Sequence, residues 1–379
     1  MPGADGAPTA PGTPEVPGGP GGPGASGVPA ASAASAARTR VSRPRAARVY
    51  GIAVAFLVIA LLVGAMAGAA DLNPLATAAA LLDRLPLVHL SSGLSPLDRA
   101  VLFQIRLPRL VLGALIGGAL ALAGAGYQGV FRNPLVDSSL LGSSAGAGLG
   151  ATIAIVDLGT SSPAAVPVAA FVGSLAGVAF AYAAGAAGGP GTATLLLAGI
   201  AVSMFLTAVQ TYLLQRSSQD IQQVYSWLLG SLSGATWHQA AAVAPYLAVA
   251  GGTVLLHGRH LDVLSVGDEE ARSLGLHPAR IRLLVVAACS LATAAAVAVS
   301  GLIGFVGIVV PHAVRRLGGT SYRRVLPLSL LFGAGFLVLA DTLARTVVAP
   351  AELPIGVVTA LIGSPAFVWI LRSTRAVRT

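Results

Sequence analysis

The side chains that could carry out chemistry in this chain are few, and their types exclude several kinds of active site. The 379 residues include one cysteine, Cys289, and no lysine. Without lysine, the chain has neither a Walker A phosphate-binding loop nor Schiff-base chemistry. A single cysteine within an apolar run predicts a packed side chain, and it rules out a disulfide or a thiolate metal cluster within one chain.

The histidines do not share the spacing of a metal site. They are His89, His238, His257, His260, His277 and His312. His257 and His260 lie three residues apart at a predicted helix end, where histidine side chains often bind last-turn carbonyl groups. No nucleophile elbow supports a Ser-His-Asp triad. We therefore predict no metal site, no catalytic residue and no cofactor bound by this chain itself.

Charge gathers at one place in the sequence, the stretch GDEEARSLG at 267–275, which holds three of the 14 acidic residues in a row. Carboxylates suit the first turn of a helix, and Gly275 can adopt the left-handed conformation that ends one. His277 and Pro278 then predict a second short helix that leads into the next apolar segment. Two short helices with an apolar ridge at Ala271 and Leu274 suit a docking surface, and the alternative is an ordinary polar connection. The residues of this predicted docking segment are Gly267, Asp268, Glu269, Glu270, Ala271, Arg272, Leu274 and Gly275.

The elements that must position this segment are apolar helices. The chain is 55% hydrophobic and only 10% charged, and its mean hydropathy is +0.80. Apolar runs long enough to cross a bilayer, about 20 residues each, recur along it. The sequence therefore predicts an all-α membrane protein with about ten transmembrane helices, near 49–70, 108–130, 140–157, 163–184, 192–214, 237–256, 281–300, 303–317, 325–348 and 355–371.

Two segments divide the chain by composition. Residues 1–48 are rich in proline, glycine and alanine and predict a disordered tail, whereas 49–379 form the transmembrane domain. The tail ends in five arginines followed at once by an apolar run, which also resembles a signal peptide. The run is about 22 residues long and many spans follow, so we favour an uncleaved first helix.

The 23 arginines indicate orientation. They are dispersed between apolar segments and do not form a patch for nucleic acid, so no nucleic-acid partner is predicted. Placing both termini in the cytoplasm puts 17 of the 23 inside. The chain is therefore predicted to be a multi-pass protein of the cell membrane, surrounded by lipid, with the 267–275 segment facing the cytosol.

Three long stretches resemble one known family. RLPRLVLGALIGGALALAGAGYQGVFRNPLVDSSLLGSSAGAGLGA at 106–151 is similar to the second and third helices of the FecCD/BtuC-type ABC importer permeases, which take up ferric siderophores, haem and vitamin B12. SGLIGFVGIVVPHAVRRLGG at 300–319, with LADTLAR and AELPIGVVTALIGSPAFVWIL at 339–345 and 351–371, resembles their last three helices. The resemblance covers 50–375 in order, and the long tail departs from it.

The resemblance assigns roles to particular residues. The 267–275 segment matches the coupling helices that contact the ATPase subunits. Arg106 and Arg109, three residues apart on one helix face, are expected to be exposed, and with Arg345 they match arginines that receive acidic residues of the extracellular binding protein. Membrane anchoring, or an ion pair of Arg345 with Asp341 one turn earlier, would also explain them. The pathway gate is expected at Thr192 and Ala193. Structural turns are expected at Asn133, Pro134, Gly301, Gly304 and Gly307, with a short helix dipping back after Gly301.

The function expected from this resemblance is that of the transmembrane permease subunit of a binding-protein-dependent importer, most simply for ferric siderophores, with haem or cobalamin as alternatives. The expected partners are two ATP-binding cassette subunits that bind ATP and Mg²⁺, a solute-binding protein, and a second permease that is identical or a close paralogue. A secondary transporter is the alternative from another class, with Asp341 as its clearest ionisable group. An intramembrane enzyme is the poorest alternative.

Overall fold

The computed structural model of the chain describes residues 43–68, 73–84, 93–157, 164–189, 191–217 and 219–375. Residues 46–379 form one compact unit, which is described here by itself. Of the predicted tail at 1–48, residues 1–42 lie outside the described residues, and residues 43–48 already belong to helix α2, which begins at Arg43, six residues earlier than predicted.

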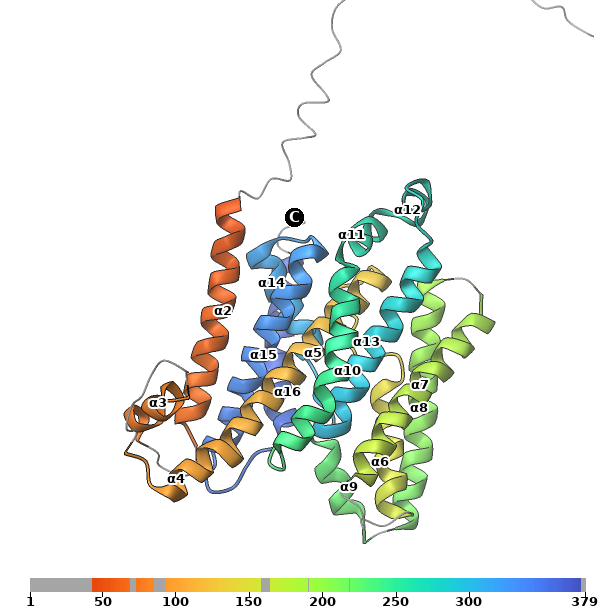
Figure 1. Ribbon diagram of the computed structural model, residues 1–379. Coiled ribbons are helices and arrows are strands. Elements are labelled where there is room, and N and C mark those ends of the chain that lie inside the picture. The colour runs from red at the N-terminus through yellow and green to blue at the C-terminus, as the bar shows by residue number, and fades with distance from the viewer. Residues whose placement is uncertain are drawn as a thin grey trace, which may run out of the picture. The chain divides into compact units, whose positions relative to one another are not determined.

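Throughout the described ranges, the regular structure is helical (Figure 1). The helices are α2 (Arg43–Met66), α3 (Pro74–Leu82), α4 (Pro96–Ala100), the π-helical turn η1 (Val101–Arg106), α5 (Leu107–Phe131), α6 (Ser143–Val156), α7 (Ala165–Ala187), α8 (Thr192–Arg216), α9 (Ile221–Leu228), α10 (Trp237–Leu256), α11 (Gly258–Val266), α12 (Asp268–Ser273), α13 (Pro278–Ser300), α14 (Val306–Gly318), α15 (Tyr322–Thr346) and α16 (Ile355–Arg375).

The predicted all-α membrane fold is confirmed. The ten predicted ranges correspond in order to α2, α5, α6, α7, α8, α10, α13, α14, α15 and α16. In the described part of the chain, seven helices are long and apolar enough to cross a membrane, and α6 and part of α16 are shorter apolar helices. The second span begins earlier than predicted, because Ser95 accepts a hydrogen bond from the Asp98 N–H at 3.1 Å and Pro96 follows it in the first helical turn.

Helix α5 lies in the core of the bundle and packs against α10, α13, α14 and α15. Within the most apolar window of its span 83% of the residues are buried, against 11% for α8. Its small residues allow close packing: a Cβ on Gly117 would overlap the carbonyl oxygen of Gly333 on α15. The single cysteine, Cys289 on α13, is fully buried against α5, as predicted.

Helices α6 and α7 pack through glycines. Gly142, Gly146 and Gly150 recur every fourth residue, and a Cβ on Gly146 would overlap the carbonyl oxygen of Gly173 on α7. This small-xxx-small pattern therefore lets the two backbones approach closely.

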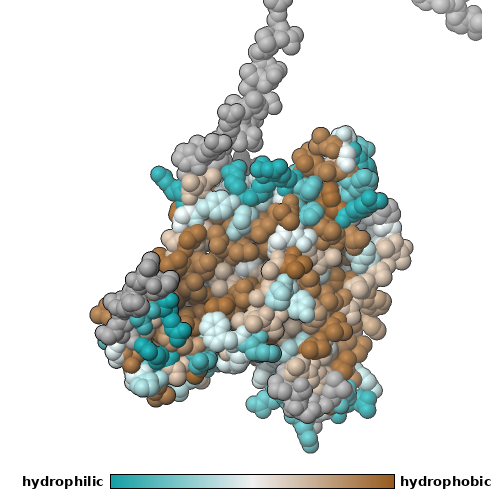
Figure 2. Space-filling model, in the orientation of Figure 1, coloured by the Kyte–Doolittle hydropathy of each residue, from teal (hydrophilic) through white to brown (hydrophobic). Residues whose placement is uncertain are grey.

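Several chain segments meet at one end of the bundle, the upper end in Figure 1, where α12 lies. Val49 at the start of α2 lies beside Gly318 at the end of α14, and the Arg316 guanidinium lies over the Trp369 ring of α16 at 4.9 Å from its centroid. Figure 2 shows hydrophilic residues gathered at this end above a broad apolar band. The start of α2 and the later part of α16 thus lie on the same side as α12, as the predicted topology requires.

Candidate functional site

The predicted docking segment forms the short helix α12, whose first turn carries Asp268, Glu269 and Glu270 as expected. It ends in a Schellman motif: Gly275 has φ +77°, its N–H donates to the Arg272 carbonyl at 2.9 Å, and the Leu276 N–H donates to the Ala271 carbonyl at 2.9 Å. The left-handed residue was therefore predicted correctly.

Two details of this segment were predicted wrongly. No separate helix begins at His277, because Pro278 is already the first residue of the 23-residue helix α13. The short partner of α12 is α11, on its other side, and the buried residues Leu261 and Leu264 three positions apart were the signal that could have revealed it.

The expected apolar ridge is only half present. Ala271 is fully buried in the core of the chain, whereas Leu274 is 68% exposed and Val266 is 71% exposed. Ala271 therefore anchors α12 to the bundle, because a short helix must bury some apolar surface of its own. Leu274 and Val266 are left as the apolar groups that a partner could cover.

Asp268 connects α12 to two long helices. Its Oδ1 accepts hydrogen bonds from Arg132 Nη2 at 2.8 Å and from Arg282 Nη2 at 2.5 Å. Arg132 ends α5 in the left-handed conformation with φ 51°, and Arg282 lies near the start of α13. Desolvation by itself would raise the pKa of Asp268, but the bond to Arg282 and the charges of the nearby arginines hold that pKa below its ordinary value. Asp268 is thus a carboxylate at neutral pH, shared by two guanidinium groups.

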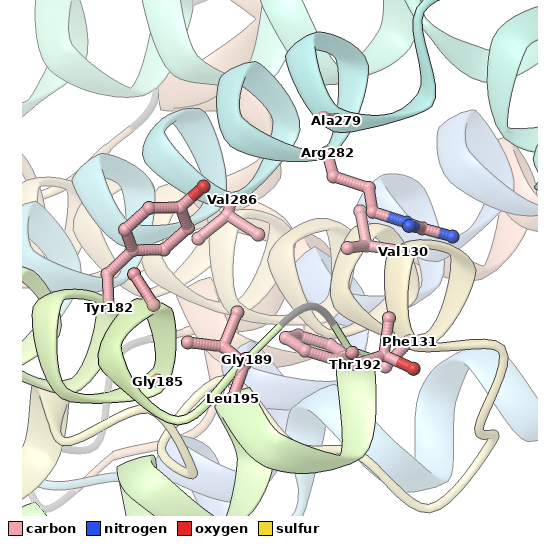
Figure 3. Close-up of a pocket in the computed structure, with 12 residues that line it drawn as sticks. Val130, Phe131, Tyr182, Gly185, Gly189, Thr192, Leu195, Ala279, Arg282 and Val286 are labelled. Carbon is pink, nitrogen blue, oxygen red and sulfur yellow. The ribbon is translucent and has the colours of Figure 1, made fainter.

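A cavity of about 220 Å³ lies beside this ion-pair cluster (Figure 3). Its wall includes Phe131 at the end of α5, Tyr182 on α7, Thr192 at the start of α8, and Arg282 on α13. The predicted gate residue Thr192 therefore lies where four helices meet. Its neighbour Ala193 is exposed and is not part of this wall. The gate role of both residues remains a prediction.

The three arginines predicted to receive a binding protein are buried, and the expectation that Arg106 and Arg109 are exposed was wrong. Arg106, Arg109 and Arg345 are 4%, 8% and 6% exposed. Arg106 donates to the carbonyls of Ala65 and Met66 at the end of α2, at 2.9 and 3.1 Å. Their charges are met inside the chain because carboxylates and free helix-end carbonyls lie within reach.

Arg109 is the centre of a charged cluster with Arg106, Arg345, Asp341 and Glu352 at the end of the bundle away from α12, which is called the outer cluster below. It binds both carboxylate oxygens of Asp341 on α15, at 2.9 to 3.1 Å, and both of Glu352, at 2.9 and 3.0 Å. Arg345 lies 3.6 Å from Asp341 and also bonds to the Gly64 carbonyl. The pair between Asp341 and Arg345 is present as the alternative interpretation required, but Arg109 is the closer partner of Asp341.

The predicted turn residues have mixed outcomes. Asn133 accepts a hydrogen bond from the Leu135 N–H at 3.0 Å and Pro134 follows in the turn, so α5 ends here as predicted. Gly301 ends α13 with φ +68° and packs against Gly230.

Beyond Gly301 the prediction fails. Residues 301–305 contain no helix, so the expected short helix is absent from this turn. A Cβ on Gly304 would meet no atom within 4 Å, and Gly307 lies inside α14, where its backbone contacts Gly124 on α5. Gly307 is thus small for helix packing and not for a turn. The short helix beside Gly301 is α9, whose Trp227 carbonyl lies against it.

The bond predicted for His257 is present in the structure. His257 Nδ1 lies 2.7 Å from the Thr253 carbonyl at the end of α10, which is the role predicted for it.

The seven helices of the described residues that could cross a membrane, with the charged helical hairpin at one end of the bundle, indicate a multi-pass membrane protein. The sequence model of the FecCD transport family matches residues 56–373, and the chain belongs to that family of ABC transporter permeases. The chain is 43% identical over 284 residues to the cobalamin import system permease protein BtuC of Halobacterium salinarum, covering 75% of this chain and 76% of that one.

The names of other relatives refer to different substrates. The hemin transport system permease protein HmuU of Yersinia pestis is 42% identical, with 73% of this chain and 84% of that chain covered. The Fe(3+) dicitrate transport system permease protein FecD of Escherichia coli is 38% identical, with 72% and 85% covered. A solved structure described as an inward-facing conformation of a metal-chelate type ABC transporter superposes with a TM-score of 0.76 at 29% identity, covering 86% of this chain and 98% of that chain.

Proposed function

We propose that this chain is the transmembrane permease subunit of a binding-protein-dependent ABC importer for ferric siderophores, with haem and cobalamin as the alternative substrates. The chain has no lysine for a phosphate-binding loop, so ATP and Mg²⁺ would be bound by two separate ATPase subunits. The termini and α12 would face the cytoplasm, where most of the arginines would then lie.

The observation that carries this proposal is the geometry of α12. A capped, six-residue helix is held at the end of the bundle, with Leu274 exposed and acidic residues around it. Next to it, a surface cavity of about 470 Å³ is lined by residues from Arg272 to Arg280. A protruding apolar residue beside a groove suits insertion into the cleft of a partner, and an ATPase subunit would push on this helix.

A second permease subunit would cover α8. This helix is apolar enough to span a membrane yet is the least buried of the seven, and Leu197, Met204 and Phe205 on it are 58% to 70% exposed. An identical chain or a close paralogue packed there would enclose a translocation pathway between the two subunits.

A solute-binding protein would dock at the opposite end, over the outer cluster. Arg109 and Arg345 there meet the carboxylates of Asp341 and Glu352. The Glu352 side chain is 39% exposed and is the member that could give way to an acidic side chain of the partner. Docking at these arginines therefore requires Glu352 to move.

An ion-coupled transporter is the alternative. The ionisable residue predicted for it, Asp341, is already held by Arg109 and so is a poor ion site. Asp137 favours this alternative more, because its buried carboxylate accepts hydrogen bonds from the Ser138 N–H and the Ser139 hydroxyl at 2.7 and 3.0 Å.

Uptake in proteoliposomes separates the two. The full complex of permease, ATPase and binding protein would be given labelled ferric siderophore, haem or cobalamin, with ATP on the α12 side or with an imposed proton or sodium gradient. We expect ATP-dependent uptake of ferric siderophore that a protonophore does not abolish. Uptake of haem or cobalamin instead would establish an alternative substrate, and gradient-driven uptake without ATP would contradict the importer proposal.

A further inference from the structure

The hairpin formed by α11 and α12 is attached to the bundle by one aspartate on each helix. On α11, Asp262 accepts hydrogen bonds from the Ser321 hydroxyl at 2.7 Å and from the Tyr322 N–H at 2.5 Å. These donors lie at the start of α15, where unpaired N–H groups and the positive end of the helix dipole favour a carboxylate. On α12, Asp268 binds Arg132 and Arg282.

The two attachments differ in what they reach. Asp262 holds the start of α15. Asp268 holds two different helices with a single oxygen atom, because Arg132 is the C-cap residue that directly follows α5 and Arg282 belongs to α13. A displacement of α12 therefore pulls on α5 and α13 together.

Helices α5 and α15 are joined along their length. Near their middle the backbones approach at Gly117 and Gly333 too closely for a side chain, and at the outer end Arg109 binds Asp341. Helices packed together in this way move as one body, since tightly packed interiors do not deform continuously. A pull on the inner end of α5 is thus carried towards the outer cluster.

Helix α13 connects Asp268 to the cavity. Arg282 bonds to Asp268 and also lines the cavity wall that includes Thr192 on α8 (Figure 3). Its Nε is buried without a hydrogen-bond partner in the structure, so the bond from Nη2 to Asp268 is what orients this guanidinium. A movement of α12 that carried Asp268 with it would shift Arg282 in the wall of the cavity that also includes the predicted gate residue Thr192.

We propose that Asp268 is a positioning residue of the transport cycle, whose paired bonds to Arg132 and Arg282 transmit the movement of α12 to α5 and to the wall of the Thr192 cavity. This inference rests on the proposed function, in which an ATPase subunit drives α12. The side chains of the three residues are 21% to 37% exposed, and ion pairs this exposed add little to folding stability. Removing these ion pairs should therefore leave folding intact but stop the movement of α12 from reaching α5 and the cavity wall.

The experiment uses the complete complex in proteoliposomes and measures substrate molecules imported per ATP hydrolysed. Asp268→Asn keeps the shape of the side chain but loses its charge, and we expect the ratio to fall by at least about fivefold, the lower range of typical coupling energies. Complex assembly and the rate of ATP hydrolysis should persist. Asp268→Glu should recover part of the loss, and Asp98→Asn, at the opposite end of the bundle, is the matched control.

A double-mutant cycle gives the decisive readout. If Asp268 acts through Arg282, then Asp268→Asn combined with Arg282→Gln should be no worse than Asp268→Asn alone. Losses that multiply in the double variant would overturn the inference. It would also be overturned by a normal transport ratio in Asp268→Asn, or by failure of that variant to assemble, which would show a role in folding.

A cross-link separates failure of this inference from failure of the proposed function. Cysteine introduced at Ser273, which is exposed on α12, should cross-link to the ATPase subunit in the wild-type background and in Asp268→Asn alike. If both cross-link but transport is unchanged, only the role of Asp268 is refuted. If the wild-type background gives no cross-link, the docking of an ATPase subunit on α12 is refuted as well.

Discussion

Arg109 and Asp341 lie 232 residues apart in the sequence and form a two-pronged ion pair between α5 and α15, with three nitrogen–oxygen distances of 2.9 to 3.1 Å. Asp341 is 2% exposed, so this pair joins two central helices where little water can replace either partner. The pair brings together residues for which the sequence alone suggested separate roles.

Removing one member of this pair should destabilise the protein strongly. Asp341→Leu leaves the Arg109 charge with only Glu352, and breaking a buried pair from one side costs about 3–5 kcal/mol. Thermal unfolding in detergent would show a lowered midpoint. The double variant Arg109→Met/Asp341→Leu should recover part of the loss, because it removes the buried Arg109 charge together with its closest partner, and Glu352, which also loses Arg109, is 39% exposed. A double variant as unstable as the sum of the singles would contradict this explanation.

Charge and shape on α12 should be needed for coupling. Glu270→Ala combined with Leu274→Arg alters two exposed side chains, so folding should be unaffected, whereas contact with an ATPase subunit should be lost. We expect ATP hydrolysis that no longer supports uptake. Leu97→Arg, an equally exposed leucine on α4 at the other end, is the control. Normal uptake by the α12 variant would count against the docking role.

Topology can be tested by chemical labelling, because the natural Cys289 is fully buried. A cysteine at Ser273 should react with a membrane-impermeant maleimide only in inside-out vesicles, and a cysteine at Leu97 only in right-side-out cells. Mass spectrometry of the labelled protein gives the readout. The reverse pattern would place α12 outside the cell and would remove the basis of the proposed function.

Because α6 and α7 pack through glycines, adding one methyl group at their contact should destabilise the protein, whereas the same addition at an open position should not. A Cβ on Gly146 overlaps the Gly173 carbonyl oxygen, whereas a Cβ on Gly51, on α2, meets no atom within 4 Å. Gly146→Ala should therefore cost about 1–3 kcal/mol by overpacking. Gly51→Ala should be neutral or slightly stabilising, because alanine is the better helix former. Equal unfolding midpoints for the two variants would refute the close contact.

The ion pairs of Asp268 predict how the amount of substrate imported per ATP hydrolysed responds to pH and salt. Because the folded pKa of Asp268 is lowered, its ion pairs are complete above the ordinary value of 3.8 and are lost only as pH falls through the lowered pKa. The imported substrate per ATP should therefore show no inflection from Asp268 between about pH 5 and 8. The same ratio should fall as ionic strength rises, because partly exposed pairs are screened. A salt-independent ratio, measured alongside Asp268→Asn, would argue against transmission through these pairs.

Most of the helices, and the form of α12, could be predicted from short stretches of the sequence. The apolar runs predicted ten helices within the described residues, seven of them long and apolar enough to cross a membrane, since a span must satisfy its backbone groups internally and must be apolar for about 20 residues. The three acidic residues and Gly275 predicted α12 and its end, because helix dipoles and left-handed conformations are properties of a few neighbouring residues.

Contacts between distant segments were beyond such reasoning. Whether Arg109 faces solvent or Asp341, whether Ala271 points outward or into the core, and whether Gly307 serves a turn or a helix contact all depend on which helices pack together. The same holds for Asp268, whose two partners lie 136 and 14 residues away. Periodicity gives the face of a helix, but the partner of that face is chosen by the packing of the whole bundle, and only the tertiary structure shows it.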